Sequence, residues 1–279
     1  MHFLLCTKKT GMGEVRMSRG SFYAAWVAAA MGVVLVPLGA AAQQSGSTAA
    51  TKAPAPSTAQ IAAWQNAHEE QMKNDWPWLG RFKQADEMLG APAAGEDRVV
   101  FMGDSITEGW KLEESFPGKP YVNRGISGQT SPQMLLRFRQ DVIELEPKVV
   151  VILAGTNDIA GNTGPMTLKE TEDNLASMAD LATAHHIKVV LCSVTPAFDF
   201  PWHPEQEPAE KIVALNQWIK EYAAQKDYVY VDYHSAMKDE RGGLPARLSK
   251  DGVHPNAAGY AVMAPLAEAG IEKALQGGE

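Results

Sequence analysis

The stretch that decides the fold is Arg98-Val-Val-Phe-Met-Gly-Asp-Ser-Ile-Thr107. Its short apolar run, Val99 to Met102, leads into a glycine and then an acid–serine pair. Such a run is typical of a buried parallel strand that stops at the carboxyl edge of a sheet, and Gly103 would let the backbone turn there. Ligands of open α/β sheets bind outside that edge, so Ser105 stands where a working side chain would be placed. Taken alone, however, the triplet fits a simple helix cap equally well.

Working outward, apolar runs alternate with segments of helical spacing. The runs that predict further strands are Tyr121 onward, Val149–Leu153, Ile187–Leu191 and Tyr228–Val231. The segments that predict helices are Pro132–Ile143, Thr167–His185, Ala209–Ala224 and Asn256–Leu275. This alternation predicts an α/β fold with right-handed crossovers, in which five parallel strands carry helices on both faces.

The first 42 residues have the pattern of a secretory signal peptide. Basic residues precede an apolar run from Phe22 to Leu38, which closes in Gly39-Ala-Ala-Ala42. We expect cleavage after Ala42, with a retained membrane anchor as the alternative, and the true start could be Met12 or Met17. The mature protein is then expected outside the cytoplasm, secreted or periplasmic, with no membrane association.

The remaining chain divides into three parts by composition. Residues 43–58 are rich in Ser, Thr, Ala and Pro and read as a flexible linker. Residues 59–97 predict an N-terminal helical arm whose aromatic residues pack it onto the domain; a sugar-stacking platform is the other interpretation. Those aromatic residues are Trp64, Trp76, Trp78 and Phe82. Residues 98–279 form the expected catalytic domain.

The charge balance narrows the class of partner. The 279 residues carry a net charge of −8, and residues 1–42 contain four basic residues but only one acidic one, so the mature chain is more acidic still. An acidic protein is a poor partner for nucleic acid or an anionic membrane. After cleavage Cys192 is the single cysteine, and its apolar neighbours indicate a buried, inert thiol.

Near the C-terminus, Asp251-Gly-Val-His-Pro255 can supply an acid and a base. Two intervening residues allow one tight loop to hold the carboxylate against the imidazole, and Pro255 favours an extended backbone at His254. A carboxylate that accepts the Nδ1 proton leaves Nε2 to take a proton from a serine hydroxyl. The pattern alone could equally cap the last helix.

Four blocks together resemble the SGNH hydrolases, also called the GDSL esterase or lipase family. In chain order they are Gly-Asp-Ser105, Gly128, Gly-Thr-Asn157-Asp158 and Asp251-x-x-His254. The resemblance spans residues 98–260 and is closest to the acetylhydrolase-like branch, which includes platelet-activating-factor-acetylhydrolase-like enzymes and carbohydrate acetylesterases. It implies a flavodoxin-like, three-layer α/β/α fold.

The resemblance also implies roles for residues of this chain. Ser105 would be the nucleophile, His254 its base and Asp251 the acid that orients the base. The oxyanion hole would consist of the backbone N–H groups of Ser105 and Gly128 and the side-chain amide of Asn157. Gly128 fits the second block better than Gly125 does, because Gln129-Thr130 follow it. Preorganised donors of this kind stabilise the charge that develops on the ester carbonyl oxygen.

Other candidates are weaker. The loop Pro196–Pro204 follows a strand end and carries Phe198, Trp202 and His203, which we expect to contact substrate. His185 and His186 end a helix without further ligands nearby, so no metal is expected. Asp104 and Asp158 are expected to bind backbone amides. Neither an α/β-hydrolase elbow nor a phosphate-cradling loop is found, and no cofactor is expected.

The sequence therefore predicts a secreted serine ester hydrolase that acts on a small-molecule or glycan ester, with a short acyl group, acetyl on a carbohydrate, as the expected substrate. The alternatives are a lysophospholipase or thioesterase for longer chains, an O-acetyltransferase, and a non-catalytic glycan-binding module.

Overall fold

The computed structural model describes residues 58–277. The predicted signal peptide and all but the last residue of the predicted linker lie outside this range. Compactness divides the chain into two units, Met1–His68 and Glu69–Glu279, which are described separately. Helix α2, Thr58–Asn74, crosses that boundary, and everything below concerns the second unit. Within the described residues no helix combines the length and apolar character needed to cross a membrane.

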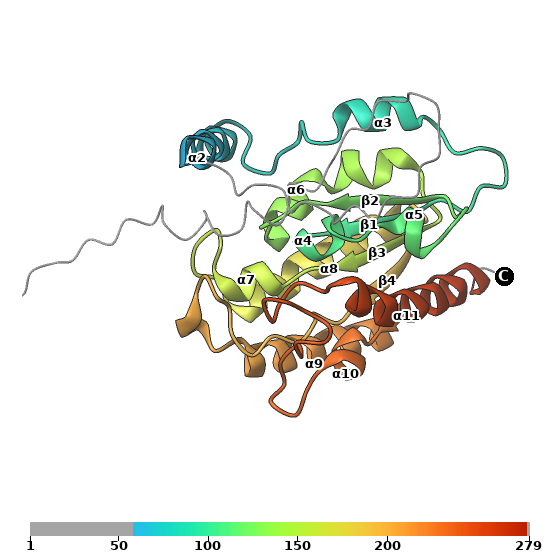
Figure 1. Ribbon diagram of the computed structural model, residues 1–279. Coiled ribbons are helices and arrows are strands. Elements are labelled where there is room, and N and C mark those ends of the chain that lie inside the picture. Colours follow the sequence, from blue (N-terminus) through green and yellow to red (C-terminus); the bar gives the residue numbers. More distant parts are fainter. Residues whose placement is uncertain (1–57, 278–279) are drawn as a thin grey trace, which may run out of the picture. The chain divides into compact units, whose positions relative to one another are not determined.

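The core of the second unit is a five-stranded parallel sheet in the order β2-β1-β3-β4-β5 (Figure 1). The strands are β1 Val99–Gly103, β2 Tyr121–Gly125, β3 Val149–Leu153, β4 Lys188–Cys192 and β5 Val229–Val231. Every strand predicted from the sequence is present, with ends that differ by one residue or so. The three-layer α/β/α prediction is confirmed.

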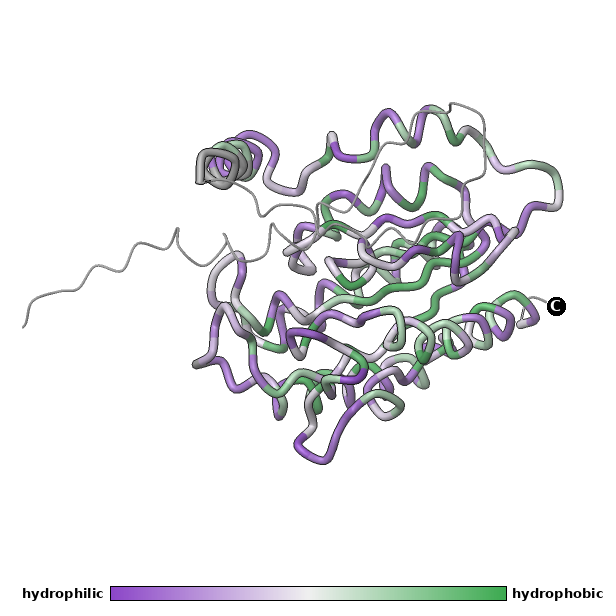
Figure 2. The backbone as a smooth tube through the Cα atoms, in the orientation of Figure 1, coloured by the Kyte–Doolittle hydropathy of each residue, from purple (hydrophilic) through white to green (hydrophobic). Residues whose placement is uncertain are grey.

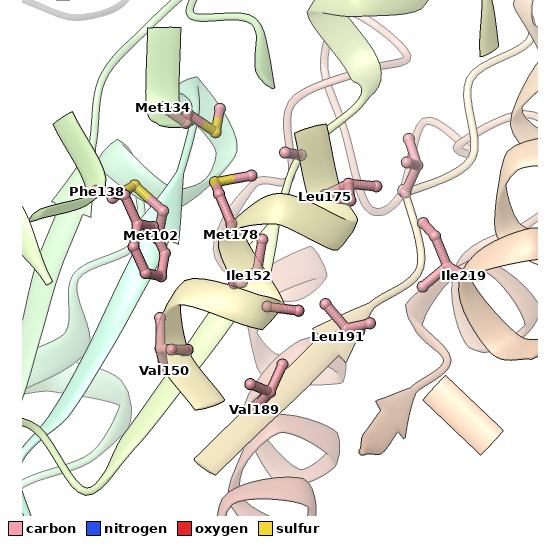
Figure 3. Packing of buried hydrophobic residues seen from close by; sticks show 14 of the residues in the cluster. Met102, Met134, Phe138, Val150, Ile152, Leu175, Met178, Val189, Leu191 and Ile219 are labelled. Atoms are coloured by element: carbon pink, nitrogen blue, oxygen red, sulfur yellow. The ribbon is translucent and has the colours of Figure 1, made fainter. Parts of the chain in front are cut away.

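Side chains alternate between the two faces of the sheet. Val100 and Met102 of β1 point to one hydrophobic cluster, while Val99 and Phe101 point to the other. Because both faces are covered, the central strands are apolar at every position, and they form the most hydrophobic part of the tube in Figure 2. Figure 3 shows the first cluster, in which Met178 packs among residues of the strands and neighbouring helices.

Three long helices cover the first face: α6 Ser131–Asp141, α8 Leu168–Ala184 and α9 Pro208–Lys226. The second face is covered by α4 Ser105–Glu108, α5 Leu112–Ser115, α10 Tyr233–Met237 and α11 Ala257–Gln276. The remaining elements are α3 Lys83–Leu89, α7 Thr156–Ala160 and the 3-10 turns η3 Ile143–Leu145 and η4 Pro204–Gln206.

The long helices begin where capping chemistry places them. Thr130 and Thr167 each form a capping box at the start of α6 and α8, so α8 starts one residue after the predicted Thr167. Helix α4 begins at Ser105 behind the N-cap Asp104, where the acid–serine pair indicated a helix start. The short helices α5, α7 and α10 were not predicted, because four or five residues are too few to show an apolar period.

Strand order determines where a site can form. The chain passes from β1 outward to β2 and then returns across β1 to β3, so the direction of winding reverses between β1 and β3. At such a switch point the connecting loops part and leave a crevice at the carboxyl ends of the strands. Ser105 follows β1 and Asn157 follows β3, so both lie at this point.

Part of the arm, residues 75–89, contacts α6 and the loop before it. The side chain of Gln133 donates to the carbonyl of Trp76 at 2.7 Å, and that of Gln129 donates to the carbonyl of Pro77 at 2.8 Å. The Phe82 ring lies 4.7 Å from the Arg124 guanidinium. These contacts tie the arm to the loop that carries Gly128.

Candidate active site

Ser105 is the first residue of α4, directly after β1. The Asp104 carboxylate caps this helix by accepting the N–H of Ile106 at 2.9 Å. Gly103 is required for a different reason from the one predicted, because its φ is not positive and the constraint is space. A Cβ at Gly103 would overlap the Thr107 hydroxyl and lie 2.8 Å from the carbonyl of Leu153. Close packing of β1 against β3 and α4 thus positions Ser105.

The structure brings Ser105, His254 and Asp251 into one hydrogen-bonded chain. Ser105 Oγ lies 2.9 Å from His254 Nε2, and His254 Nδ1 lies 2.8 Å from Asp251 Oδ2. A carboxylate can only accept, so the proton between the ring and Asp251 belongs to Nδ1. Nε2 of the neutral ring is then an acceptor for the serine hydroxyl, the arrangement that a general base requires.

Asp251 is held by its own loop. Its Oδ1 accepts the backbone N–H groups of Val253 at 3.0 Å and His254 at 2.8 Å, and the Ser249 hydroxyl at 3.0 Å. Gly252 has a φ of 81°, which closes the turn. Partial burial by itself would raise the pKa of Asp251, but the hydrogen bonds from the His254 ring and backbone outweigh it and lower the pKa well below its usual range. Asp251 therefore stays ionised beside the imidazole.

The two glycines that compete for the second block have different roles. A Cβ on Gly125, inside β2, would overlap the backbone of Thr107 and Glu108, so this glycine serves close packing. Gly128 has a φ of 77°, and a Cβ there would meet only the Asn162 side chain, at 3.9 Å. Within residues 58–277 the backbone N–H groups of Ser105 and Gly128 donate to no protein acceptor. Both are therefore available as donors to a bound molecule.

Asn157 is 3% exposed and reaches across the switch point. Its Nδ2 donates to the Gln129 carbonyl at 3.0 Å and lies 3.3 Å from Asp104 Oδ2. The first distance is a normal hydrogen bond, while the second exceeds the usual range, so one amide proton is held only weakly. The side chain thus links the first, second and third blocks and does not cap the turn in which it lies.

Asp104 and Asp158 are both buried at the switch point. Burial raises the pKa of Asp104 to about 7, although the Ile106 N–H opposes the shift. Burial also raises the pKa of Asp158, which accepts the backbone N–H and hydroxyl of Ser131. Asp104 binds a backbone amide within its own turn, as predicted, whereas Asp158 binds the backbone amide of Ser131, 27 positions away, and so joins α7 to the start of α6.

A buried cation supports the loop before α6. Arg137 is 0% exposed and pairs with Asp141 at 2.8 Å on the same helix. Its Nε donates to the Gln129 side chain at 2.6 Å, and its Nη2 donates to the Gly103 carbonyl at 3.0 Å. One side chain therefore connects the end of β1 with the residue that holds the Asn157 amide.

Only part of the loop 196–204 lies near the three residues Ser105, His254 and Asp251. Trp202 stacks on the buried Phe200 ring at 5.1 Å, and its ring centre lies 6.3 Å from that of His254. Phe198 is 52% exposed and lies 5.1 Å from the Arg241 guanidinium. The backbone N–H of His203 donates to Phe200 at 2.8 Å. Of the three predicted substrate residues, Trp202 is the one that these contacts place beside the triad.

Cys192 is buried without a disulfide partner, and burial raises the pKa of its thiol to about 12. The predicted burial of Cys192 is confirmed. Over residues 58–277, no cluster of three or more His, Cys, Asp or Glu side chains is placed to hold a metal ion.

Sequence reasoning missed Arg137 and Asn162. The sequence contained a pattern that could have indicated Arg137. Arg137 and Asp141 stand at positions i and i+4 on the helix face that also carries the apolar residues Met134 and Phe138. No such pattern indicated Asn162. It lies just beyond α7, and its contacts reach Asn157, Gly128 and Trp202 from separate segments.

A parallel sheet with a serine, a histidine and an acid in contact at its switch point defines a class of hydrolase. In agreement with this geometry, residues 101–262 match the GDSL-like lipase/acylhydrolase family. The chain belongs to that family and is a carboxylic ester hydrolase.

Individual relatives carry the comparison further. A solved GDSL-like lipase of Bacteroides thetaiotaomicron is 46% identical, with a TM-score of 0.69 over 72% of this chain and 100% of that one. An acetylxylan esterase of Geobacillus stearothermophilus is 28% identical over 63% of this chain and 95% of its own length. Esterase TesA of Pseudomonas aeruginosa is 30% identical over 60% of this chain and 84% of its own length.

Proposed function

We propose that this protein is a serine ester hydrolase that removes acetyl groups from a carbohydrate outside the cytoplasm. The observation that carries the proposal is the continuous chain Asp251–His254–Ser105, with hydrogen-bond distances of 2.8 and 2.9 Å. In this proposal Ser105 is the nucleophile, His254 the general base and Asp251 the residue that orients the ring.

The reaction follows from the donors and acceptors present. His254 Nε2 takes the proton of Ser105 Oγ as that oxygen bonds to the ester carbonyl carbon. The carbonyl oxygen becomes an anion that accepts the N–H groups of Ser105 and Gly128 and one amide proton of Asn157, which exchanges its long contact to Asp104 for the stronger acceptor.

Collapse of this intermediate breaks the bond to the alcohol oxygen, which receives the proton from His254 and leaves. The acyl group is then bonded to Ser105. A water molecule gives its proton to Nε2 and attacks the acyl carbon, and the second collapse releases the acid and restores the serine hydroxyl.

Two observations favour a short acyl group on a sugar. Acetylxylan esterases are among the similar proteins, at 28% identity over nearly the full length of one of them. In addition, Trp202 lies beside His254 with its indole anchored to Asn162, so a large rigid side chain borders the site. We propose that this side chain limits the acyl group and offers a face against which a sugar ring can pack.

A second candidate, hydrolysis of longer acyl esters, is favoured by the similarity to Esterase TesA at 30% identity. The exposed Phe198 ring could support such a chain, since it provides apolar surface on the same loop as Trp202. Location outside the cytoplasm rests on residues 1–42 alone; mass spectrometry of the exported protein, with an N-terminus near Gln43, is the test.

A panel of esters tests the proposal. The protein lacking residues 1–42 is assayed with p-nitrophenyl acetate, butyrate and octanoate and with acetylated xylo-oligosaccharides, and an organophosphonate is used to label the nucleophile. We expect acetyl to exceed octanoyl in kcat/KM, release of acetate from the sugar, and a phosphonyl adduct on Ser105. A preference for octanoyl would favour the second candidate, and labelling of another serine would remove Ser105 from the mechanism.

A further inference from the structure

Asn162 is a half-buried residue that lies between three parts of the site. Its Nδ2 donates to Asn157 Oδ1 at 2.8 Å and to the Gly128 carbonyl at 3.2 Å. Its Oδ1 accepts the indole N–H of Trp202 at 3.1 Å. One side chain thus touches both a proposed oxyanion donor and the loop of the other, and anchors the aromatic residue beside His254.

The direction of these bonds is determined at both ends. An indole nitrogen can only donate, so the oxygen of Asn162 must face Trp202 and its nitrogen must face Asn157 and Gly128. That nitrogen requires an acceptor, so the oxygen of Asn157 faces Asn162. The nitrogen of Asn157 then faces the Gln129 carbonyl, which can only accept.

This polarity matters for the proposed reaction. The two ends of a side-chain amide have nearly the same shape, and a half-turn of Asn157 would exchange its donor for its acceptor. Turned in that way, its oxygen would face the carbonyl of Gln129 and Asp104, and a lone pair would replace a donor to the oxyanion. The contact with Asn162 at the oxygen end and the Gln129 carbonyl at the nitrogen end therefore together favour the orientation in which Asn157 stabilises the developing charge.

We propose that Asn162 is a positioning residue for the oxyanion hole, which fixes the amide orientation of Asn157 and the loop of Gly128 and couples both to Trp202. This inference rests on the proposed function, because it assumes that Asn157 is an oxyanion donor. Asn162 itself touches neither the substrate nor the reacting atoms. Its effect on turnover must therefore pass through Asn157 and Gly128.

A double-mutant cycle tests the inference. Asn162→Ala, Asn157→Ala and the double variant are assayed with p-nitrophenyl acetate, with Tm measured on the same preparations. We expect Asn162→Ala to lower kcat by up to roughly 10²-fold, the loss that follows a misplacement of about 1 Å, with little change in KM. In the Asn157→Ala background the same substitution should lower kcat by a clearly smaller factor, since only its effect through the Gly128 loop remains.

A transition-state analogue supplies a readout that a purely structural role would not move. Phenylboronic acid can bond to Ser105 as a tetrahedral anion, so its inhibition constant should rise in parallel with the loss of kcat across the three variants. Asn174→Ala is the matched control. Asn174 is also half-buried and donates to the Ser131 hydroxyl at 3.0 Å, a bond that involves none of Asn157, Gly128 and Trp202, so its kcat and inhibition constant should be unchanged.

Trp202→Phe is the second variant, to be used also if Asn162→Ala does not fold. It keeps an aromatic ring and removes the donor that orients Asn162, so kcat should fall by less, and the fall should again shrink in the Asn157→Ala background. Full turnover in a folded Asn162→Ala protein, or equal losses with and without Asn157, would overturn the inference. If Asn157→Ala alone retains full kcat, the oxyanion role of Asn157 in the proposed function is wrong. This outcome differs from a failure of the positioning role of Asn162, in which Asn157→Ala lowers kcat but Asn162→Ala does not.

Discussion

The two sides of the proposed site are built in opposite ways. The loop 249–256 that carries Asp251 and His254 is partly exposed, with 38% and 21% of these side chains accessible, and its hydrogen bonds join residues two or three positions apart. The Asn157 side is buried, and its amide nitrogen binds residues 28 and 53 positions away. The loop with Asp251 and His254 is local in sequence and partly exposed to solvent. The Asn157 side is assembled from distant segments and is buried.

The acids of the two sides show what this difference does. Asp251 in its loop is surrounded by donors, and its pKa is lowered despite partial burial. Asp104 on the buried side receives one good backbone donor, and burial raises its pKa to about 7. The loop therefore keeps a charge next to His254, while the proposed oxyanion donors of the buried side are neutral. In the proposed mechanism, proton transfer and charge stabilisation are thus separated in space.

The largest expected effect lies where the two sides meet. Ser105→Ala removes the nucleophile, and kcat for p-nitrophenyl acetate should fall by roughly 10⁶, because neither side can act without the bond that Ser105 forms. Ser235→Ala, an exposed serine in α10, is the control and should behave as the wild type. Substantial turnover by a folded Ser105→Ala protein would refute the triad.

The next effect tests the local side. In Asp251→Asn the amide oxygen can still accept the N–H groups of Val253 and His254, so the loop should fold. The amide nitrogen, however, now faces Nδ1 as a donor and forces the ring proton onto Nε2, which faces Ser105. We expect kcat per folded molecule to fall by roughly 10⁴, in addition to any loss of stability measured as Tm. A large drop in Tm with kcat per folded molecule preserved would make Asp251 a structural residue only.

A substitution on the buried side should lower kcat less than Asp251→Asn does. Asn157→Ala removes one of three oxyanion donors, and kcat should fall by roughly 10²–10³ with little change in KM. Asn157→Asp should be at least as harmful, because it places a carboxylate beside Asp104 and the oxyanion.

Asn216→Ala is a matched control for Asn157→Ala. Asn216 is another buried asparagine, and both of its amide atoms bind the backbone of Val194. Its loss should lower Tm while kcat per folded molecule stays constant. The same behaviour in Asn157→Ala would remove Asn157 from the site.

The smallest effect concerns stability and pH. The folded protein holds the Asp104 proton more tightly than the unfolded chain does, so this group makes the free energy of unfolding fall as pH rises from about 4 to 7, by up to about 1.4 kcal/mol per pH unit. Asp104→Asn removes that contribution. Its stability relative to the wild type should therefore rise with pH over this window, as measured by urea unfolding at several pH values.

For Asp251 the sign is reversed. Its lowered pKa contributes stability that is present above about pH 4 and is lost as the pH falls through the folded value. The destabilisation in Asp251→Asn should accordingly shrink in acid. Slopes of the same sign for the two variants would contradict the opposite electrostatics of the two sides.

The same contrast explains what could be predicted from the sequence. Val99–Met102 and Val149–Leu153 were predictable because burial on both faces makes every position apolar, and the acid–histidine loop was predictable because its partners lie within a few residues. The bonds among Asn157, Gln129 and Asn162 join segments whose proximity exists only once the sheet has formed. Gly103 shows the same limit, since its constraint is the neighbouring chain and not its own backbone angle.

Arg137 gives the buried side a property that matters to anyone who wishes to alter this enzyme. This one cation joins the carbonyl before Asp104-Ser105 to the side chain of Gln129, and its charge is balanced by Asp141 out of contact with water. Changes on the buried side are therefore not independent mutational steps: a variant library that randomises Gln129 without Arg137 would sample mostly proteins in which the buried Nε–H of Arg137 has lost its acceptor. In the loop 249–256, by contrast, an exposed position outside the proposed triad, such as Lys250, can be varied on its own.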